Sequence, residues 1–399
     1  MVAALHIAIC GAGPAGLSAA LALQASGHRI TVFDQFERPR PLGSGLILQP
    51  SGLAVLDWLG LGTRMRTLGA RIDRLYGKAA ASGRVVLDVR YEVLGAARGL
   101  AVHRAGLFNV LHDAARAAGI EVETLSQVKD LDGSSVIFNE ARRAGPFDLV
   151  VDALGSNSPL IAHASGPDYR QPLAYGAIWS SLPWPGPPFD PHSLEQRYDK
   201  ASVMSGVLPI GCVREGEAAQ AAFFWSLKVA DFPRWQAQGL QRWKERVHIL
   251  WPETAPLLDS IASAEQMVLA RYDHHMLALP YGRKLVFIGD SAHSTSPQLG
   301  QGANQALLDV KTLTECLQRH DDLADAISDY ARRRRFHVKI YQALSRLFTP
   351  FYQSDSELLP LVRDHLVAGM SRLPIAQRAL ARIVCGSLAD SGAGIVPSR

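Results

Sequence analysis

The stretch "LHIAICGAGPAGLSAALALQASGHRITVFD", residues 5–34, decides the fold because it has the pattern of a strand, a helix and a second strand. Its first apolar run stops at Gly11, which is typical of a parallel strand buried on both faces. Pro14 stands in the first turn of the helical run and Gly27 at its end, where these residue types are favoured. "RITVFD" supplies the second strand, which ends at Asp34. The stretch therefore predicts one βαβ unit.

The junction of the first strand and the helix has the pattern GxGxxG. Gly11 permits a tight turn, Gly13 lets a pyrophosphate approach the backbone, and Gly16 lets helix and strand pack closely. The start of the helix offers free N–H groups to an anion. A carboxylate such as Asp34 at the end of the second strand can accept hydrogen bonds from a ribose hydroxyl. The pattern predicts a dinucleotide site, against the alternative of a glycine-rich turn without a ligand.

A second motif, "GDSAHSTSPQLGQGANQALLD" over residues 289–309, also lies between a strand and a helix. Asp290 is a carboxylate at the end of the predicted strand "RKLVFIGD", suited to a second sugar or ribityl hydroxyl. The next helix start adds backbone donors at Gly300, Gly302, Ala303 and Asn304. Two such sites imply a large dinucleotide that is held at both ends. His293 is interpreted as structural or as lying beside the cofactor ring, because no second metal ligand follows at a ligating spacing, so no metal is predicted.

The chain resembles the flavin-dependent aromatic hydroxylase superfamily, the single-component FAD monooxygenases with the para-hydroxybenzoate hydroxylase fold. The resemblance covers most of the chain and rests on "GAGPAG", Asp34, "GSGLILQPSGLAVLDWLGLG", "HRAGLFNVL" and the second motif, in this order. It implies FAD as cofactor, with Asp34 at the adenosine ribose, Arg104 at the phosphates and Asp290 at the ribityl or pyrophosphate portion. The segment 300–304 would run beneath the flavin ring. Further cofactor contacts are expected at Ala15, Gln35, Gly45 and Pro297.

The same resemblance implies the reaction. NADH or NADPH would act as a transient co-substrate that reduces FAD, and the reduced flavin would add O2 to give a C4a-hydroperoxide. One oxygen atom would then pass to a small aromatic or otherwise electron-rich apolar molecule. The protein would exclude water and orient both partners.

A third motif of the family, a strand ending approximately D-x-V-V-G-A-D-G-x-x-S-x-x-R, corresponds to "FDLVVDALGSNSPLI", residues 147–161. Asp148, Gly155 and Ser158 match this pattern, whereas Asp152, Leu154 and Ile161 replace its glycine, aspartate and arginine. Gly155 still permits a close backbone approach. The replaced polar groups are associated in the family with the dinucleotide and with reduction by NAD(P)H. A two-component enzyme with a separate reductase therefore stays open as an alternative.

The substrate side matches the family less well. Relatives often carry a His in the strand that matches "GSGLILQPS" and a Tyr in the strand that matches "SGVLPIG", where this chain has Ile47 and either Val207 or Leu208. No catalytic base is assigned, although four side chains could deprotonate a phenol if they faced the site: Tyr198, Tyr272, His274 and His275. The expected apolar pocket is lined by Ile47, Leu208, Phe223, Trp225 and Pro297.

The predicted fold class is α/β (α+β), with a Rossmann-like FAD-binding domain interleaved with a mainly β-sheet substrate domain. The FAD-binding domain is expected to be discontinuous, over residues 1–70, 100–164 and 276–320. Residues 71–99 and 165–275, rich in β-branched and aromatic side chains, are predicted to form the substrate domain. A C-terminal helical segment is expected over 321–399.

The composition excludes several classes of protein. A net charge of +4, from 41 basic and 37 acidic side chains over 399 residues, argues against nucleic acid as a partner. The basic run Arg332 to Arg335 is interpreted as the solvated face of a helix. The four cysteines lack CxxC spacing, which argues against disulfides and zinc and predicts a reducing cytoplasm. No apolar run reaches the roughly 18 residues of a membrane span, so a soluble protein is expected.

Two further alternatives remain at this stage. A non-catalytic FAD-binding or sensor protein would retain flavin without consuming oxygen. A flavin-dependent halogenase is disfavoured because the WxWxIP pattern is absent from the sequence. A homodimer is compatible with the sequence, which does not determine the oligomeric state.

Overall fold

The computed structural model describes residues 2–38, 44–139, 142–367 and 373–389. The opening βαβ unit forms as predicted, from β1 (His6–Cys10), α1 (Pro14–Ala25) and β2 (Arg29–Phe33). β1 is parallel to β2 on one side and to β12 (Leu149–Asp152) on the other, with Cys10 in register with Asp152. The buried position of β1 between two parallel neighbours explains its uninterrupted apolar sequence.

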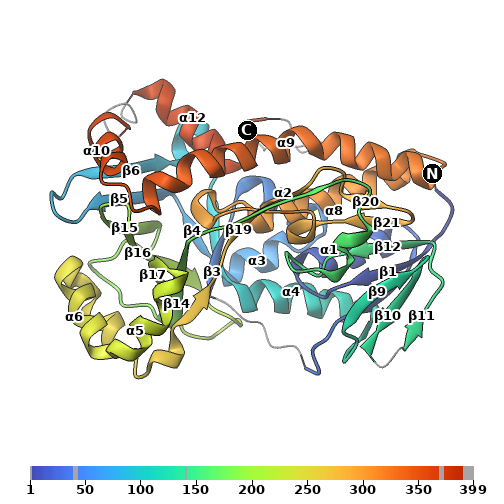
Figure 1. Cartoon of the computed structure of the whole chain (residues 1–399), viewed down its shortest axis with the longest axis horizontal. Coiled ribbons are helices and arrows are strands. Elements are labelled where there is room, and N and C mark those ends of the chain that lie inside the picture. The colour runs from blue at the N-terminus through green and yellow to red at the C-terminus, as the bar shows by residue number, and fades with distance from the viewer. Residues whose placement is uncertain (1, 39–43, 140–141, 368–372, 390–399) are drawn as a thin grey trace.

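The parallel sheet has helices on one face and a small sheet on the other (Figure 1). Its strand order is β20 (Tyr281–Gly282), β21 (Leu285–Phe287), β12, β1, β2 and β8 (Glu121–Glu123). Helices α1, α4 (Arg104–Ala117) and α8 (Gly302–Arg319) pack together beside it around one apolar cluster. The opposite face is covered by β9 (Val128–Asp132), β10 (Ser135–Phe138) and β11 (Arg143–Ala144), with Phe33 and Phe138 in contact between the layers.

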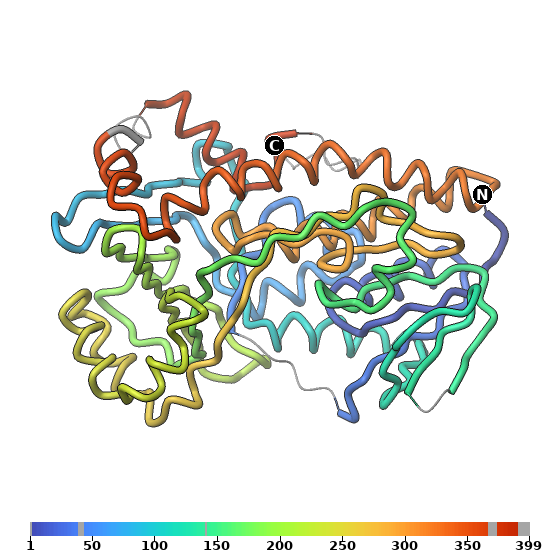
Figure 2. The backbone as a smooth tube through the Cα atoms, in the orientation of Figure 1, coloured from blue at the N-terminus to red at the C-terminus, as the bar shows by residue number. Residues whose placement is uncertain are grey.

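A second, mostly antiparallel sheet forms the other half of the molecule. Its order is β18 (Val268–Ala270), β14 (Tyr175–Pro183), β17 (Gln220–Lys228), β16 (Val203–Gly211), β15 (Ser193–Asp199), β5 (Arg74–Ala79) and β6 (Val85–Arg90). β5 and β15 are parallel neighbours although they lie far apart in the sequence, as Figure 2 shows. One face of the sheet is covered by α5 (Phe232–Gln238), α6 (Leu240–Leu250) and α7 (Ala255–Asp259).

Two small sheets connect the halves. One consists of β3 (Gly45–Leu48), β7 (Gly99–His103) and β4 (Ala70–Ile72). The other pairs β13 (Asp168–Pro172) and β19 (Asp273–Leu277) with β22 (His293–Ser294). β13 and most of β19 come from segments assigned by sequence to the substrate domain, whereas β22 comes from the expected FAD-binding domain. The two halves are therefore joined by strand pairing as well as by chain connections.

The remaining helices lie beside the parallel sheet and along one edge of the molecule. Helices α2 (Pro50–Trp58) and α3 (Gly62–Leu68) follow β3, and α9 (Leu323–Tyr352) runs along the upper edge in Figure 1. It is followed by α10 (Leu358–Val362) and α12 (Pro374–Cys385). The mixed α/β class, with an interleaved second sheet and C-terminal helices, is confirmed.

The interpretation of the basic run as a solvated face is wrong for one residue. Arg334 is 2 % exposed, and its Nε donates to Asp309 at 2.7 Å. Arg332 and Arg333 instead pair with Asp329 and Glu315 nearer the surface. Helical periodicity explains the difference, because Arg334 lies on the same inward face as Tyr330 and the residues at 337 and 338.

Within the described residues, no helix is long and apolar enough to cross a membrane. The same part of the chain contains no cluster of three or more His, Cys, Asp or Glu side chains arranged to hold a metal ion.

Candidate cofactor and substrate site

The glycine-rich turn lies at the carboxyl end of β1 and leads directly into α1. Gly11 has φ +106°, and a Cβ there would lie 2.5 Å from the carbonyl oxygen of Ala153. A Cβ on Gly16 would lie 1.8 Å from the carbonyl oxygen of Gly11, so only glycine allows this packing of helix and strand. Gly13 has no atom within 4 Å of that position, and no side chain caps the first turn of α1. The turn thus combines two tightly packed glycines with one that leaves open space at a helix N-terminus.

Asp34 follows β2 and lies next to this turn. Its Oδ2 accepts a hydrogen bond from the backbone N–H of Ala12 at 2.6 Å, and its Oδ1 accepts one from Phe36 at 3.3 Å. The carboxylate is half-buried, and the neighbouring Gln35 is exposed. Asp34 is therefore held beside the glycine turn and keeps part of its surface accessible to a ligand.

The second motif meets the first in space. Gly289 has φ +63°, and a Cβ there would lie 3.2 Å from the Cβ of Ala15 in α1 and 3.2 Å from that of Ala306 in α8. Two motifs that lie far apart in the sequence are brought together at the carboxyl ends of the parallel strands. This edge is where open α/β sheets bind ligands.

Asp290 presents an unpartnered carboxylate at this edge. Gly289 and Ser291 are buried, yet Asp290 is exposed, and its carboxylate makes no hydrogen bond to any described residue. Burial by the surrounding protein raises the pKa of Asp290, while His293 and Arg104 oppose the shift. Asp290 is exposed to solvent on one side, while the protein on its other sides excludes enough water to raise the pKa of the carboxyl group. A Cβ on Gly302, in the uncapped first turn of α8, would lie 3.9 Å from Asp290 Oδ1.

Arg104 is the first residue of α4 and has an exposed side chain. Its backbone N–H donates to the carbonyl of Ser44 at 2.9 Å, which fixes its position against β3. The guanidinium makes no ion pair with any described residue, yet its charge lowers the pKa of both Asp290 and Tyr272 against the larger effect of burial. Asp290 and Tyr272 therefore both lie within electrostatic range of Arg104.

Two expected cofactor contacts have packing roles in the structure. A Cβ on Gly45 would lie 2.3 Å from Cγ2 of Ile210, so this glycine lets β3 approach β16. Asn304 is fully buried; its Oδ1 accepts from the backbone N–H of Gln49 at 2.8 Å, and its Nδ2 donates to the carbonyl of Gly300 at 2.9 Å. Its side chain fixes the loop before α8 and leaves only backbone groups for a ligand. In that loop Gly300 has φ +60°, Ala303 is half-buried and Pro297 is half-buried.

A buried polar network holds the Asp290 turn from behind. Asp309 in α8 accepts hydrogen bonds from the backbone N–H of Gly289 and from His293 Nε2, both at 2.8 Å. The Arg334 guanidinium donates to Asp309 and to Gln305, and His337 connects Gln305 to the carbonyl of Gly386 after α12. Burial opposes ionisation of Asp309, but the charges of His293 and Arg334 hold its pKa below the usual range. Sequence reasoning missed this network, although Asp309 ends the second motif.

The apolar side chains facing this edge differ partly from those expected. Ile47 and Leu208 belong to one buried cluster, against which Trp179 packs. Phe223 and Trp225, however, point to the opposite face of β17, where both pack against Trp243 of α6. The prediction that Phe223 and Trp225 line the pocket is therefore wrong. Successive side chains along a strand point to opposite faces of the sheet, and these two point to the face that α6 covers. Phe224, between them, packs against Trp179 on the inner face, with the two tilted rings 4.5 Å apart between centroids.

Tyr272 is the polar group on this side that lies near Arg104. Trp179 Nε1 donates a hydrogen bond to the Tyr272 hydroxyl oxygen at 3.0 Å, and the hydroxyl has no acceptor among the described residues. Burial raises the pKa of Tyr272 to about 12. The phenol is therefore protonated at neutral pH and has a hydrogen to donate.

Of the other three proposed bases, Tyr198 and His275 make structural contacts, whereas His274 is buried and its Nδ1 has no hydrogen-bond partner among the described residues. The Tyr198 hydroxyl donates to Gln196 at 2.9 Å, and burial raises its pKa well above the usual value. His275 Nε2 lies 2.9 Å from Asp168, and its Nδ1 lies 3.2 Å from the carbonyl of Asp290, so it supports the turn. His274 is 2 % exposed, and burial lowers its pKa.

The third motif forms a turn organised by Asp152. This side chain is fully buried at the end of β12; its Oδ1 accepts from the N–H of Leu154 at 2.9 Å and its Oδ2 accepts from the Ser158 hydroxyl. Burial raises the pKa of Asp152 to about 7. Leu154 and Ile161 pack against an apolar cluster on the outer face of the sheet. Asp152 therefore replaces the flexibility of the family's glycine with a side chain that caps the turn.

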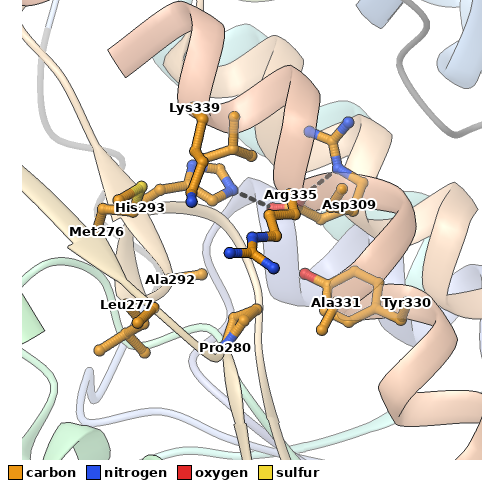
Figure 3. Close-up of a pocket in the computed structure, with 13 residues that line it drawn as sticks. Met276, Leu277, Pro280, Ala292, His293, Asp309, Tyr330, Ala331, Arg335 and Lys339 are labelled. Carbon is orange, nitrogen blue, oxygen red and sulfur yellow. Dashed lines mark hydrogen bonds and ion pairs between the residues drawn. The ribbon is translucent and has the colours of Figure 1, made fainter. Parts of the chain in front are cut away.

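A separate cavity of about 30 Å³ lies behind the Asp290 turn, between β19 and α9 (Figure 3). His293 and Asp309 form one wall, and Arg335 and Lys339 of α9 lie at its rim. Its volume is on the scale of one or two water molecules and is too small for a dinucleotide or an aromatic substrate. It is not the ligand site.

The residues at the sheet edge fit FAD. The open space at Gly13 and the uncapped starts of α1 and α8 suit phosphates, while Asp34 and the unpartnered Asp290 suit hydroxyl groups at the two ends of the molecule. The exposed guanidinium of Arg104 adds positive charge near Asp290. The exposed Asp290 carboxylate makes no hydrogen bond to the described residues, so it is free to accept hydrogen bonds from a ligand.

Comparison with known proteins agrees with this fit. Residues 4–144 match the family model described as the FAD binding domain. The chain is 28 % identical to a putative 2-heptyl-3-hydroxy-4(1H)-quinolone synthase, AqdB1, of Rhodococcus erythropolis over 85 % of this chain and 86 % of that protein. It is 24 % identical to the FAD-dependent urate hydroxylase of Klebsiella pneumoniae over 83 % and 86 % of the two chains.

Solved structures share the fold. The crystal structure of Klebsiella pneumoniae HpxO complexed with FAD and uric acid superposes with a TM-score of 0.80 at 20 % identity, covering 96 % of this chain and 98 % of the other. Taken with the sequence motifs and the geometry of the sheet edge, these similarities identify the chain as an FAD-dependent monooxygenase that is similar to the flavin-dependent aromatic hydroxylases.

Proposed function

We propose that this enzyme hydroxylates a neutral, apolar aromatic or heteroaromatic molecule, with O2 as oxygen donor and NADH or NADPH as reductant. The observation that carries the proposal is the Tyr272 hydroxyl, which is fixed by Trp179 beside the apolar residues on the inner face of the second sheet. Bound FAD would supply the activation of oxygen.

The chain's own residues would bind and orient the cofactor. The starts of α1 and α8 and the Arg104 guanidinium would neutralise the phosphates, and Asp34 and Asp290 would accept hydrogen bonds from hydroxyl groups. Asp309, through its hydrogen bond to the N–H of Gly289, would keep the Asp290 turn in position.

Tyr272 would position the substrate. Because its oxygen already accepts the Trp179 N–H and its pKa is about 12, the phenol would donate a hydrogen bond to a substrate oxygen or nitrogen rather than remove a proton. Ile47, Leu208 and Trp179 would contact the substrate's apolar rings and limit the access of water. The side chains of Ile47, Leu208 and Trp179 carry no charge, so a neutral molecule is favoured.

The relatives support this substrate class. AqdB1 and a Mycobacteroides abscessus protein at 26 % identity are both named for the formation of 2-heptyl-3-hydroxy-4(1H)-quinolone, which is a neutral bicyclic heteroaromatic with an alkyl chain. An apolar wall with one hydrogen-bond donor would suit such a molecule better than the more polar urate.

The test is flavin reduction under nitrogen, followed by exposure to 18O2. The FAD-loaded protein would be mixed with NADH or NADPH, alone and with each member of a panel of neutral quinolones and phenols. We expect one panel member to accelerate bleaching of the flavin, and its product to contain one atom of labelled oxygen. A protein that is reduced and then reoxidised by O2, but transfers no labelled oxygen to any member of the panel, would contradict a monooxygenase function for these substrates.

A separate reductase remains a second candidate, favoured by the altered third motif with Asp152, Leu154 and Ile161. In that case neither nicotinamide would bleach the flavin rapidly, whereas chemically reduced FAD supplied to the protein would still support hydroxylation. Rapid bleaching by NADH or NADPH would identify the nicotinamide as the electron donor, whereas hydroxylation only with supplied reduced FAD would indicate a separate reductase.

A further inference from the structure

From position 332 to position 347, the outward face of α9 carries positive and apolar side chains without any negative charge, whereas Asp325 is exposed near the start of the helix. Its exposed residues between positions 332 and 347 are Arg332, Arg335, Phe336, Lys339, Ala343, Arg346 and Leu347. At about 100° per residue they occupy one continuous third of the helix circumference. Phe336 and Leu347 are 65 % and 60 % exposed. No Asp or Glu occurs between Asp329 and Asp355.

α12 also exposes cations and a large apolar side chain. It exposes Arg378 and Arg382, together with Ile375, which is 85 % exposed, and it contains no acidic residue. α12 is attached to α9 because the Tyr341 hydroxyl donates to the carbonyl of Ile383 at 2.9 Å. Both helices lie along the same upper edge of the molecule in Figures 1 and 2. We call eight of the exposed residues of these two helices the α9–α12 surface: Arg335, Phe336, Lys339, Arg346, Leu347, Ile375, Arg378 and Arg382.

The cations of this surface form no ion pair with any residue that the structure describes. Arg332, Arg333 and Arg334 pair with Asp329, Glu315 and Asp309, so that part of the basic run is accounted for by internal contacts. Among the described residues, none forms an ion pair with the five exposed cations of the α9–α12 surface. Large apolar side chains at 60 % exposure or more are likewise unexplained by packing.

We propose that the α9–α12 surface binds the surface of a lipid bilayer that contains anionic headgroups. Cations attract anionic headgroups, and exposed apolar side chains enter the boundary between headgroups and acyl chains. The α9–α12 surface has both residue types, so its cations can contact the headgroups while its apolar side chains enter the boundary with the acyl chains. Binding would be peripheral, and it would be reversed by salt because exposed charges are screened.

A second copy of the chain fits this surface poorly. A twofold dimer through it would bring the same cations of both subunits face to face, and no acidic residue lies on the surface to compensate. A nucleic acid would use the cations but would gain little from Phe336, Leu347 and Ile375 at the same surface.

The test uses the full-length, FAD-loaded protein and sedimentation with lipid vesicles. Vesicles of phosphatidylcholine alone would be compared with vesicles that contain about 30 % phosphatidylglycerol, at about 50 mM NaCl and at higher salt. We expect at least about tenfold stronger partitioning to the anionic vesicles, and its loss as salt is raised. Equal partitioning to both vesicle types, or none to either, would overturn the proposal.

Two sets of variants locate the surface. Reversing three charges (Arg335→Glu, Lys339→Glu and Arg346→Glu) should weaken partitioning by about 100-fold or more. Phe336→Ser with Leu347→Ser should weaken it by about tenfold, because apolar burial at the interface is lost. Each substitution is at an exposed position, so FAD content and the midpoint of thermal unfolding should stay unchanged.

A matched control lies on α6, at the opposite edge of the molecule in Figure 1. Arg242 is exposed there, and Ile249 is 82 % exposed, but Glu245 accompanies them. Arg242→Glu with Ile249→Ser should leave vesicle binding unchanged. An equal effect of the α6 and α9 variants would contradict a specific surface, and so would a protein that dimerises through Phe336 and Leu347 without binding vesicles.

Discussion

The cofactor side and the substrate side of the site are built by different means. The cofactor side depends mainly on backbone geometry, with glycines at strand ends and uncapped helix starts, and it adds only a few carboxylate side chains. On the substrate side, side chains from β14, β16, β17 and the residues just before β19 meet across a sheet. Backbone requirements restrict the residue types strongly, whereas an apolar wall can be assembled in many ways. This difference explains why one side keeps recognisable motifs and the other does not.

The largest expected effect is the loss of Arg334 behind the cofactor side. Arg334→Gln leaves the Asp309 carboxylate buried with less compensation, and we expect the free energy of unfolding to fall by about 3–5 kcal/mol. Arg335→Gln, one residue along the same helix and exposed, should change it by less than about 0.5 kcal/mol. Denaturant unfolding of both variants makes the comparison. Equal stabilities would show that the buried pair does not support the Asp290 turn.

Two variants of the glycine turn distinguish the glycine needed for packing of the fold from the glycine needed for FAD binding. Gly16→Ala would place a Cβ against the carbonyl of Gly11 and should destabilise the fold by about 3 kcal/mol. Gly13→Ala meets open space, so stability should change by less than about 1 kcal/mol while FAD affinity falls. Unfolding curves and FAD titrations of the two variants are the measurements. Unchanged FAD affinity in Gly13→Ala would remove this glycine from the cofactor site.

The pH dependence of protein stability tests the role of Asp152 in the altered third motif. The folded-state pKa of about 7 is above the usual value for Asp, so the folded protein binds more protons than the unfolded chain between these values. Stability should therefore decrease as pH rises through this window. In Asp152→Asn that loss is absent, and the variant should gain about 2 kcal/mol relative to the parent between pH 5 and 6.5. A difference in stability that does not change with pH would show that Asp152 is ionised throughout.

The smallest effect is expected on the substrate side. Tyr272→Phe removes one hydrogen-bond donor and should lower kcat/KM by about tenfold, with FAD affinity unchanged. Trp225→Phe lies on the opposite face of the sheet and should affect stability without changing kcat/KM. Steady-state kinetics with an identified substrate provide the comparison. A larger kinetic effect of Trp225→Phe than of Tyr272→Phe would reverse the assignment of the two faces.

The sequence predicted the βαβ unit, the meeting of the two glycine-containing motifs and the mixed fold class, because each rests on residues that few alternatives can replace. It failed at Phe223 and Trp225, since a run of consecutive apolar residues in a strand does not reveal which alternate positions face inward. It failed at Arg334 because a charged residue in a basic run gives no sign of burial until its partner, Asp309, is found on another helix. The role of Asp152 as a turn cap depends on contacts to Leu154 and Ser158 that only the folded chain defines.

The most direct test of the account is equilibrium binding of FAD to Asp290→Ala. The Asp290 carboxylate is exposed and unpartnered, and its turn is held by Asp309 and His275, so its removal should leave the fold intact. We expect the dissociation constant for FAD to rise by about 100-fold, while Asp113→Ala, in a surface ion pair, binds FAD as the parent protein does. Full retention of FAD by Asp290→Ala would contradict the proposed placement of the cofactor at this edge of the sheet.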